Sequence, residues 1–250
     1  MDNKIGFLGF GEIGQAIHKL YQNSGLFFSY FIKDLNRHDE LKDLDVLNVA
    51  IPFNESFDFV ETVKKEIQTS NTKLAIIHST VSVGTTRALK QLLPHVKIVH
   101  SPCRGIHPHL YEGLLIFPKF LGAINDEDLD AAATHLSSLK LNVAKCDNAE
   151  TTELAKLLDT SYYGICIAYH GEAKKACEKL GANFNQAMTA YNRSYNESYT
   201  TLGKPNVVRP TLTSPEGGIG GHCIVENAEL LSKQYQSLAL DLIKQYKKQK

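Results

Sequence analysis

The sequence predicts an α/β protein, with a Rossmann-like doubly wound parallel sheet followed by a smaller all-helical domain built around one long central helix. Three observations lead to this fold class. Short apolar runs alternate with amphipathic segments, a glycine-rich GFGEIG follows the first run, and proline-free helical spacing fills residues 150–181. We therefore expect a first domain at residues 1–147 and a helical domain at residues 148–250.

The apolar runs of the first domain are predicted to be buried strands. Their apolar residues are nearly continuous rather than alternating, which is typical of parallel strands covered on both faces. In chain order these runs are 4–8, 27–32, 46–51, 74–78, 96–100, 120–124 and 142–146. The amphipathic segments between them predict helices at 11–22, 56–69, 84–92 and 126–139.

The second domain is predicted to be helical. Residues 150–181 keep helical spacing without a proline and end at Gly181, a suitable C-cap. The middle of this helix, YYGICIAYH, is apolar nearly all round, so we expect other helices or a second copy of the chain to enclose it. A further helix is predicted at 183–200, and helical spacing from Leu231 to Tyr246 predicts a final helix.

Composition restricts the partners and the location. Lysine plus arginine equals aspartate plus glutamate at 27 each, so neither nucleic acid nor an anionic membrane is expected as a partner. The sequence begins without a signal-like layout and holds no apolar run of membrane-spanning length, which predicts a cytoplasmic protein. Five irregularly spaced cysteines without a CxxC pair indicate free thiols, and no metal is expected.

The segment GFGEIG at 9–14 predicts a dinucleotide site. Its GxGxxG pattern follows a predicted strand and opens a predicted helix, which is the context that makes this motif specific. The first glycine permits a tight turn, the second permits close approach of a pyrophosphate, and the third permits packing of helix on strand. Phosphate would bind at the helix N-terminus. The predicted cofactor contacts here are Gly9, Gly11, Glu12, Ile13 and Gly14.

Asp34 indicates which dinucleotide is bound. It lies twenty residues past Gly14 and follows a predicted strand, where a carboxylate would hydrogen-bond the adenosine ribose, and this favours NAD. Lys33 and Arg37 lie nearby, and since the extra phosphate of NADP prefers a cation, NADP stays open as the alternative. A glycine-rich turn without a ligand is the other alternative.

A second glycine-rich segment, GGIGGHC at 217–223, raises the question of a reactive thiol. Glycines let the backbone come close to another group, so Cys223 would be presented to a small molecule as a nucleophile. The alternative is a glycine-rich turn that a cysteine follows by chance.

Six segments in register resemble the UDP-glucose/GDP-mannose dehydrogenase family, which includes the UDP-N-acetylmannosamine dehydrogenases. In chain order they are GFLGFGEIG, VAIP, HSTVSVGTT, SPCRGIHP, ETTELAKLLDTSYYGICIAYHGE and GGIGGHCI. The resemblance implies an NAD-dependent dehydrogenase that oxidises a sugar alcohol twice. In that chemistry a cysteine thiolate adds to the intermediate aldehyde, and the resulting thioester is hydrolysed.

The resemblance also implies roles for individual residues. Cys223 matches the nucleophile, Lys156 matches a lysine that stabilises a developing oxyanion, and Thr80 matches a hydroxyl near the cofactor and the reacting water. Pro52 in VAIP and Thr80 join the predicted cofactor contacts, and Thr160 occupies a catalytic position one helical turn after Lys156. Without the resemblance, Lys156 is interpreted as a surface lysine and Thr80 as a strand-end cap.

Three residues depart from the family pattern. Cys103 replaces the glutamate of Ser-Pro-Glu, Asn227 replaces an acidic residue, and Thr160 replaces an asparagine. A thiol is a poor substitute for the carboxylate that assists thioester hydrolysis. The resemblance also ends before the family's second Rossmann-like domain, which holds much of the nucleotide, so the C-terminal nucleotide-sugar-binding domain is expected to be lacking. We therefore expect a substrate smaller than a nucleotide sugar, or a single oxidation step.

The leading hypothesis is an NAD(P)-dependent oxidoreductase of a small-molecule alcohol, a sugar or a nucleotide sugar, with its active-site loop at 214–227. We expect it to form a homodimer through the long helix. The alternative is a dinucleotide-binding sensor or a degenerate, non-catalytic paralogue. Two minor hypotheses concern thiols, namely a reversible disulfide between Cys103 and Cys223, or a zinc site on the loops that hold them. The zinc ligands would include His100, His107 and His109.

Overall fold

The computed structural model describes residues 3–54, 56–105, 108–220 and 223–248. The chain forms two compact units, Met1–Lys156 and Leu157–Lys250. The first unit contains the sheet, and the second consists of helices and their connections. The domain boundary predicted at 147/148 lies at the start of the long helix, whereas the division between the two units lies within that helix.

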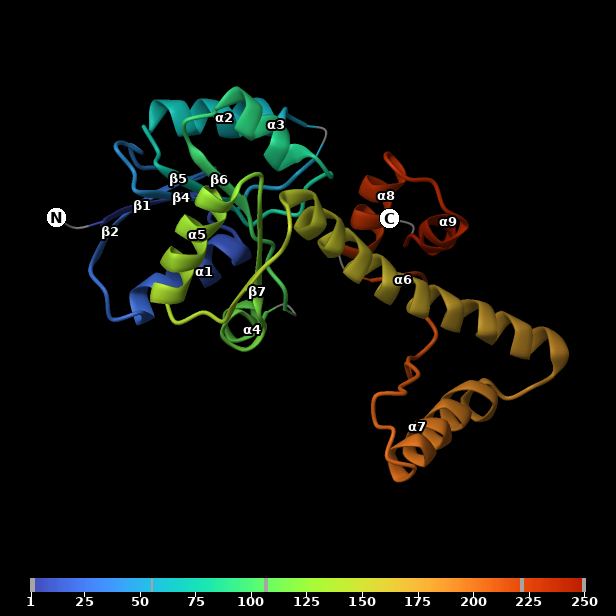
Figure 1. The fold of residues 1–250 in the computed structure, drawn as a ribbon. Coiled ribbons are helices and arrows are strands. Elements are labelled where there is room, and N and C mark those ends of the chain that lie inside the picture. The colour runs from blue at the N-terminus through green and yellow to red at the C-terminus, as the bar shows by residue number, and fades with distance from the viewer. Residues whose placement is uncertain (1–2, 55, 106–107, 221–222, 249–250) are drawn as a thin grey trace. The chain divides into compact units, whose positions relative to one another are not determined.

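Within the described residues, the sheet of the first unit has eight strands in the order β3-β2-β1-β4-β5-β6-β7-β8 (Figure 1). Most neighbouring strands run parallel, which confirms the predicted α/β class. The strands are β1 (Asn3–Leu8), β2 (Phe28–Asp34), β3 (Arg37–His38), β4 (Val46–Val49), β5 (Leu74–Ile77), β6 (Lys97–His100), β7 (Lys119–Ala123) and β8 (Val143–Lys145).

Two strand pairs of the described sheet run antiparallel, within a sheet that is otherwise parallel as predicted. β3 pairs antiparallel with the end of β2, and β7 pairs antiparallel with β6. β3 has only two residues, which is too short for a periodic signal. β7 follows α4 (Leu110–Ile116), a short helix that the sequence pattern does not predict. The sequence does not predict that β7 runs antiparallel to β6, because apolar periodicity carries no information about strand direction.

Helices cover both faces of this sheet, as the doubly wound prediction requires (Figure 1). Each face has its own buried apolar cluster, one around Phe7 and Tyr21 and the other around Leu47 and Ile77. Burying each such side chain contributes about 2 kcal/mol to folding. The helices are α1 (Glu12–Asn23) and α5 (Asp126–Ser138) on one face, and α2 (Phe59–Thr69) and α3 (Thr85–Leu92) on the other.

The long helix α6 (Ala149–Leu180) has 32 residues, which confirms the predicted central helix. A π-helical stretch (Asn185–Ala190) and α7 (Tyr191–Thr201) occupy the range predicted as the next helix. None of the helices in the described part of the chain is long and apolar enough to cross a membrane.

The prediction of one final helix is wrong. α8 (Cys223–Ser232) and α9 (Leu238–Gln245) are separate helices. The Ser237 hydroxyl accepts a hydrogen bond from Ala239 N at 3.3 Å and caps α9. A polar cap therefore starts a new helix where apolar spacing alone indicates continuity.

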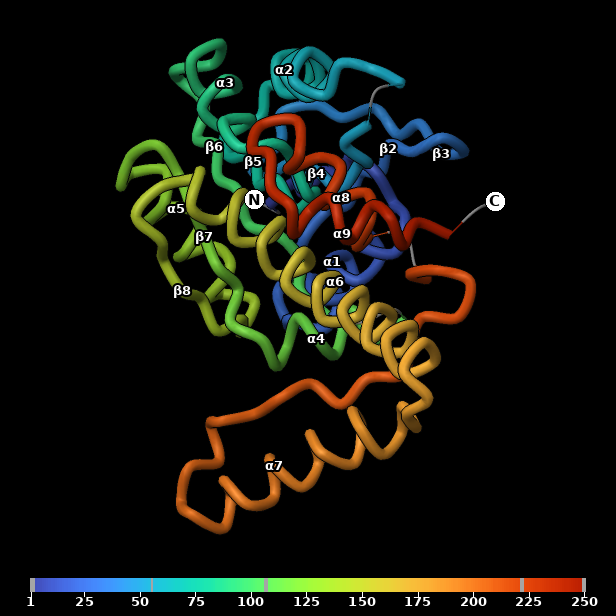
Figure 2. The backbone as a smooth tube through the Cα atoms, turned by 90° about the vertical axis from the view of Figure 1, so that its right-hand side faces the viewer, coloured from blue at the N-terminus to red at the C-terminus, as the bar shows by residue number. Residues whose placement is uncertain are grey.

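The segment after α7 runs back along that helix (Figure 2). Asn196 Nδ2 donates a hydrogen bond to Arg209 O at 2.9 Å, and Asn196 Oδ1 accepts one from Arg209 N at 2.8 Å. Asn192 Nδ2 donates to Pro210 O at 3.0 Å. These side-chain amides satisfy the backbone of an irregular segment that leads to the second glycine-rich run.

Candidate active site

Four predicted cofactor residues lie at one edge of the sheet. Gly9 follows β1, Asp34 ends β2, Pro52 follows β4 and Thr80 follows β5. These strands are parallel neighbours, so their carboxyl ends share that edge. The strand order reverses at β1, which pairs with β2 on one side and β4 on the other, and ligands of open α/β sheets bind at such a switch point.

The glycines of GFGEIG have different surroundings. A Cβ on Gly9, which has a φ of +91°, would lie 2.6 Å from Ala50 O, and a Cβ on Gly14 would lie 2.3 Å from Gly9 O. A Cβ on Gly11 would meet no described atom within 4 Å. Gly9 and Gly14 are therefore required by the packing of the chain itself, whereas the space at Gly11 is open to a ligand.

Asp34 lies directly against the glycine-rich loop. Its carboxylate accepts hydrogen bonds from Phe10 N at 2.5 Å and from Leu35 N at 2.7 Å. The backbone supports the same contact, since Gly9 N donates to Lys33 O at 2.9 Å. A carboxylate accepts about four hydrogen bonds, so Asp34 keeps acceptor capacity for ribose hydroxyls.

The N-terminus of α1 completes this corner. Glu12 and Ile13 form the first turn of the helix, and Gly11 at the N-cap position supplies no side-chain cap. A helix N-terminus without a side-chain cap presents backbone N–H groups to an anion. The residues present therefore fit a dinucleotide, with pyrophosphate at Gly11 and ribose at Asp34.

The two cationic side chains that could bind the extra phosphate of NADP, Lys33 and Arg37, both form ion pairs with carboxylates. Lys33 Nζ lies 2.6 Å from Glu66 Oε2, and Arg37 lies 2.8 Å from Asp39 Oδ2. A 2′-phosphate would have to compete with these ion pairs.

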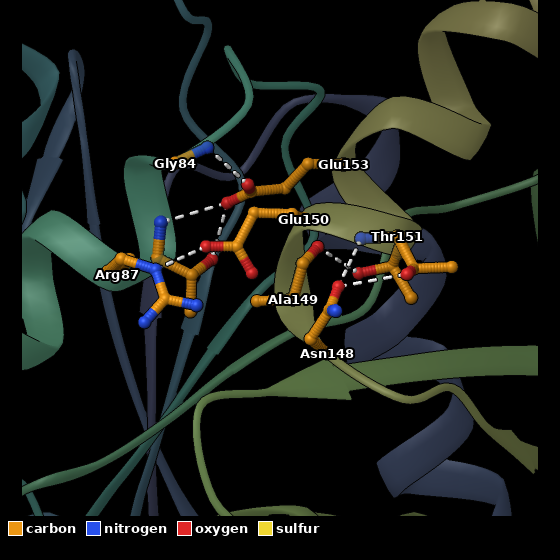
Figure 3. Close-up of polar contacts among 9 residues, drawn as sticks. Gly84, Arg87, Asn148, Ala149, Glu150, Thr151 and Glu153 are labelled. Atoms are coloured by element: carbon orange, nitrogen blue, oxygen red, sulfur yellow. Dashed lines mark hydrogen bonds and ion pairs between the residues drawn. The ribbon is translucent and has the colours of Figure 1, made fainter.

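A buried carboxylate with no signal in the sequence, Glu153, holds the start of α3 to the N-terminal part of α6 (Figure 3). Glu153 Oε2 accepts a hydrogen bond from Gly84 N at 2.7 Å, and Oε1 accepts from Thr86 N at 2.8 Å and from Thr86 Oγ1 at 2.7 Å. Burial raises the pKa of Glu153, while these hydrogen bonds oppose the rise. Glu153 lies three residues before Lys156, so it fixes the helical turn that carries the predicted catalytic lysine.

Lys156 and Cys103 are both near a buried amine, Lys119, which was also missed. Lys119 Nζ donates hydrogen bonds to Ser101 O at 2.6 Å and Pro102 O at 3.0 Å, and lies 3.5 Å from Cys103 Sγ. Burial lowers the pKa of Lys119, Cys103 opposes this shift, and the charge of Lys156 adds to it. A lysine immediately before a predicted strand is ordinarily exposed, so the sequence held no signal for it.

Two buried histidines, His78 and His100, form hydrogen bonds between neighbouring strands near this edge of the sheet. His78 Nε2 lies 3.0 Å from Asn48 Oδ1, and His78 Nδ1 lies 3.0 Å from Ser101 O. Both ring nitrogens of His100 also have partners, Thr152 Oγ1 at 2.8 Å and Ser79 O at 3.1 Å. Burial lowers the pKa of His100 to about 3.

These contacts bear on the zinc hypothesis. His100 has no ring nitrogen left for a metal, and His107 lies outside the described residues. In the part of the chain that the structure describes, no group of three or more His, Cys, Asp and Glu side chains is arranged to hold a metal. All five cysteines, each within the described residues, are free thiols.

The second unit carries Cys223, which is exposed and begins α8. The preceding glycine-rich run is held by the C-terminal segment, because Ile219 N donates a hydrogen bond to Tyr246 O at 2.7 Å. Gly221 and His222 lie outside the described residues. The Cys223 thiol thus lies at the start of α8, and the Ile219–Tyr246 hydrogen bond holds the glycine-rich segment that precedes this helix.

Two of the three departures from the family pattern contact each other. Asn227 Nδ2 donates a hydrogen bond to Thr160 Oγ1 at 3.1 Å, which joins α8 to α6. Neither an amide nor a hydroxyl is a base at neutral pH, so this pair can orient a water molecule but cannot deprotonate it.

Comparison with known proteins gives a family. The profile described as "UDP-glucose/GDP-mannose dehydrogenase family, central domain" matches residues 150–248. The helical part of the chain therefore matches the central domain of the UDP-glucose/GDP-mannose dehydrogenase family. This confirms the resemblance drawn from the six segments.

Relatives within this family share modest identity with the chain. The UDP-N-acetyl-D-mannosamine dehydrogenase of Methanocaldococcus jannaschii is 26% identical over 73% of this chain and 38% of the relative. The Campylobacter jejuni UDP-N-acetyl-D-mannosamine dehydrogenase is 26% identical over 74% of this chain and 48% of the relative. The chain therefore spans less than half the length of these curated members of the UDP-glucose/GDP-mannose dehydrogenase family.

Solved structures agree on the fold. The UDP-D-ManNAc dehydrogenase of Pyrococcus horikoshii superposes with a TM-score of 0.80 at 18% identity, covering 97% of this chain and 68% of that protein. The shared fold extends over both the sheet and the helices that follow it.

Proposed function

We propose that the chain is an NAD-dependent oxidoreductase that oxidises an alcohol group of a sugar or nucleotide sugar. One observation carries the proposal, the contact of the Asp34 carboxylate with Phe10 N of the glycine-rich loop at 2.5 Å. This contact puts a ribose-binding carboxylate beside a phosphate-binding loop at the switch point of the sheet. The ion pairs of Lys33 and Arg37 favour NAD over NADP.

Several of the predicted cofactor residues have a role in this proposal. Bound NAD would supply the hydride acceptor. Gly11 and the start of α1 hold the pyrophosphate, Asp34 holds the ribose, and Pro52 and Thr80 line the same edge.

The proposed chemistry uses two further residues. The Lys156 ammonium stabilises negative charge that develops on the substrate oxygen as the alcohol loses its proton and hydride. Cys223 is the nucleophile that adds to an aldehyde. Thr160 and Asn227 orient water rather than activate it, so hydrolysis of a thioester on Cys223, which forms only after the second oxidation, is slow or absent. We propose that the reaction either stops at the aldehyde after one oxidation or stalls at the thioester.

The exposed face of α6 supports a homodimer. Tyr162 is 65% exposed and Tyr169 is 57% exposed, although both lie on a segment that is apolar nearly all round. Aromatic rings of this size are enriched in protein interfaces. Light scattering should give the mass of a dimer, and Tyr162→Glu should shift it toward the monomer. A monomeric mass for the unmodified chain would contradict the dimer.

The central test combines cofactor binding with turnover. Calorimetric titration should show NAD binding, and Asp34→Asn should weaken it about tenfold or more, because a charge-assisted hydrogen bond is lost. Reduction of nicotinamide, followed by absorbance, should appear with one member of a panel of nucleotide sugars and free sugars. Absence of dinucleotide binding in the folded protein would end the proposal.

Substitution of the candidate nucleophile separates the two oxidation steps. Cys223→Ser should lower oxidation of the aldehyde at least about a thousandfold while NAD binding stays intact. Cys177→Ser, on α6 away from the proposed machinery, is the matched control. Equal aldehyde oxidation by both variants would remove Cys223 from the mechanism.

The replacement of two carboxylates, at Cys103 and Asn227, favours a second candidate function, a dinucleotide-binding sensor. NAD binding without nicotinamide reduction on any substrate of the panel would support the sensor over the enzyme.

A further inference from the structure

Cys103 and Lys119 form a buried thiol–amine pair in the first unit. Cys103 is 6% exposed and Lys119 is 3% exposed. The Lys119 Nζ atom lies 3.5 Å from Cys103 Sγ. Cys103 is part of one buried apolar cluster, and Lys119 begins β7, which contributes Leu121 and Ala123 to the same cluster. A lysine so deeply buried is rare unless it is paired, and here a thiol stands among its partners.

The hydrogen bonds of Lys119 direct it toward the sulfur. A neutral amine has two N–H groups and one lone pair. The two backbone carbonyls, Ser101 O at 2.6 Å and Pro102 O at 3.0 Å, match the two N–H groups. The lone pair can then take the proton of the Cys103 thiol, and the resulting third N–H donates to the sulfur, which lies 3.5 Å from Nζ. Burial, which lowers the pKa of Lys119, favours this neutral form.

We propose that Cys103 and Lys119 form a redox-modification site, in which hydrogen peroxide oxidises the thiol and the amine then bonds to the sulfur. The product is a sulfenamide crosslink, Sγ–Nζ, between the segment that follows β6 and the start of β7. A sulfenic acid condenses with a neighbouring nitrogen in this way when the nitrogen is held close.

The steps balance without a further reagent. The Lys119 amine takes the proton of the Cys103 thiol, and the thiolate attacks one oxygen of hydrogen peroxide, breaking the O–O bond. The hydroxide that leaves takes the proton back from the ammonium, giving water, a sulfenic acid and a neutral amine. The amine then attacks the sulfur, the S–O bond breaks, and a second water leaves. The sulfur is oxidised, the peroxide is reduced, and the protein loses two hydrogen atoms.

The crosslink has a consequence for the candidate active site. The crosslink would convert the Lys119 amine, which interacts electrostatically with Lys156, into a sulfenamide nitrogen that does not take up a proton at neutral pH. Two equivalents of a thiol reductant restore the thiol and the amine and form one disulfide of the reductant. The site would therefore respond reversibly to peroxide.

The test is peptide mass spectrometry of the full chain after treatment with hydrogen peroxide. Trypsin cleaves after Lys97 and Arg104, which releases Cys103 in residues 98–104. The expected product is this peptide joined to the one that contains Lys119, lighter than their sum by two hydrogen atoms. Cleavage after Lys119 should be lost and should return after dithiothreitol. Digestion also separates Cys103 from the four other cysteines, whose oxidation adds oxygen elsewhere.

Two variants control the assignment. Lys119→Met removes the amine while keeping the length of the side chain, and Cys103→Ser removes the sulfur. Neither should give the crosslinked peptide. If a variant does not fold, the map of the unmodified sequence still decides. Cys103 that gains only oxygen atoms, or that stays a thiol while Lys119 remains cleavable, would overturn the proposal.

Discussion

The two glycine-rich segments, GFGEIG at 9–14 and GGIGG at 217–221, differ in what requires their glycines. In the first, the added Cβ of Gly9 or Gly14 would collide with backbone at 2.6 Å or 2.3 Å. In the second, a Cβ on Gly218 would lie 2.8 Å from Tyr246 O, but one on Gly220 would meet no described atom within 4 Å. Packing of the chain thus explains why glycine is needed at most glycine positions of the first segment, but at only some of those in the second.

The difference lies in what holds each segment. The first connects β1 to α1, so the sheet and its covering helix determine its shape. The second is held by the end of the chain, through Ile219 N to Tyr246 O and a bridge between Ile219 and Lys247. A segment fixed by the sheet can be recognised from local sequence, whereas one fixed by a distant terminus cannot.

The largest effect is expected at Gly14. Gly14→Ala should lower the free energy of unfolding by about 3 kcal/mol, because the new methyl group forces Gly9 O to move. Gly11→Ala is the matched control and should stay within about 1 kcal/mol of the original stability while weakening NAD binding. Denaturant unfolding and NAD titration would measure the two effects. Equal stability of both variants would show that packing of the chain does not require the glycine at position 14.

A somewhat smaller effect is expected in the second segment. Gly218→Ala should cost about 2 kcal/mol, since Gly218 has a φ of +111° and faces the backbone of residues 246–248. Gly220→Ala should change stability by less than about 0.5 kcal/mol. The alkylation rate of Cys223 should rise in the first variant and stay unchanged in the second. A stable Gly218→Ala protein would show that the terminus does not hold the segment.

The support of the first segment should also depend on pH. The ring of His135 lies 2.8 Å from Tyr21 OH, and Asn48 links that hydroxyl to Gly6 of β1. Burial lowers the pKa of His135 from 6.5 to about 4. Between these values the unfolded chain takes up a proton that the folded chain does not, so this stabilisation is present above pH 6.5 and is lost as the pH falls.

His135→Gln isolates this contribution. The original protein should lose about 1.4 kcal/mol more than the variant for each pH unit of acidification in that window. Denaturant unfolding at several pH values would measure the difference. His95→Gln, on an exposed loop, controls for loss of an imidazole. Parallel stability curves for the His135 variant and the original protein would contradict the assignment.

The smallest effect concerns the polar contact behind the second segment. Thr160→Val removes the acceptor of the hydrogen bond from Asn227 Nδ2 and should lower stability by about 1 kcal/mol. Thr160→Ser keeps the hydroxyl and serves as the control. Thermal unfolding of the pair would show whether α8 depends on this contact. Indistinguishable midpoints would mean that α8 is held by apolar packing alone.

Much of the fold was accessible from the sequence because its signals are local. Apolar runs of five or six residues identified the longer strands, and helical spacing identified α1 and α6. The candidate cofactor residues were accessible for the same reason, since the glycine fingerprint and Asp34 stand at a set spacing along the chain. β3, α4 and the break between α8 and α9 were missed because two-residue strands, short helices and polar caps leave little periodic signal.

The sequence by itself determined the α/β class, the long helix, the dinucleotide fingerprint and the residues that match the family. Each depends on neighbours in the chain, whose spacing the backbone geometry converts directly into a face or a turn. Only the tertiary structure decided that β7 runs antiparallel to β6, that Glu153 reaches the start of α3, and that Lys119 lies against Cys103. These contacts join residues that are distant in sequence, and their geometry follows from how the sheet and its helices pack, which no local pattern records.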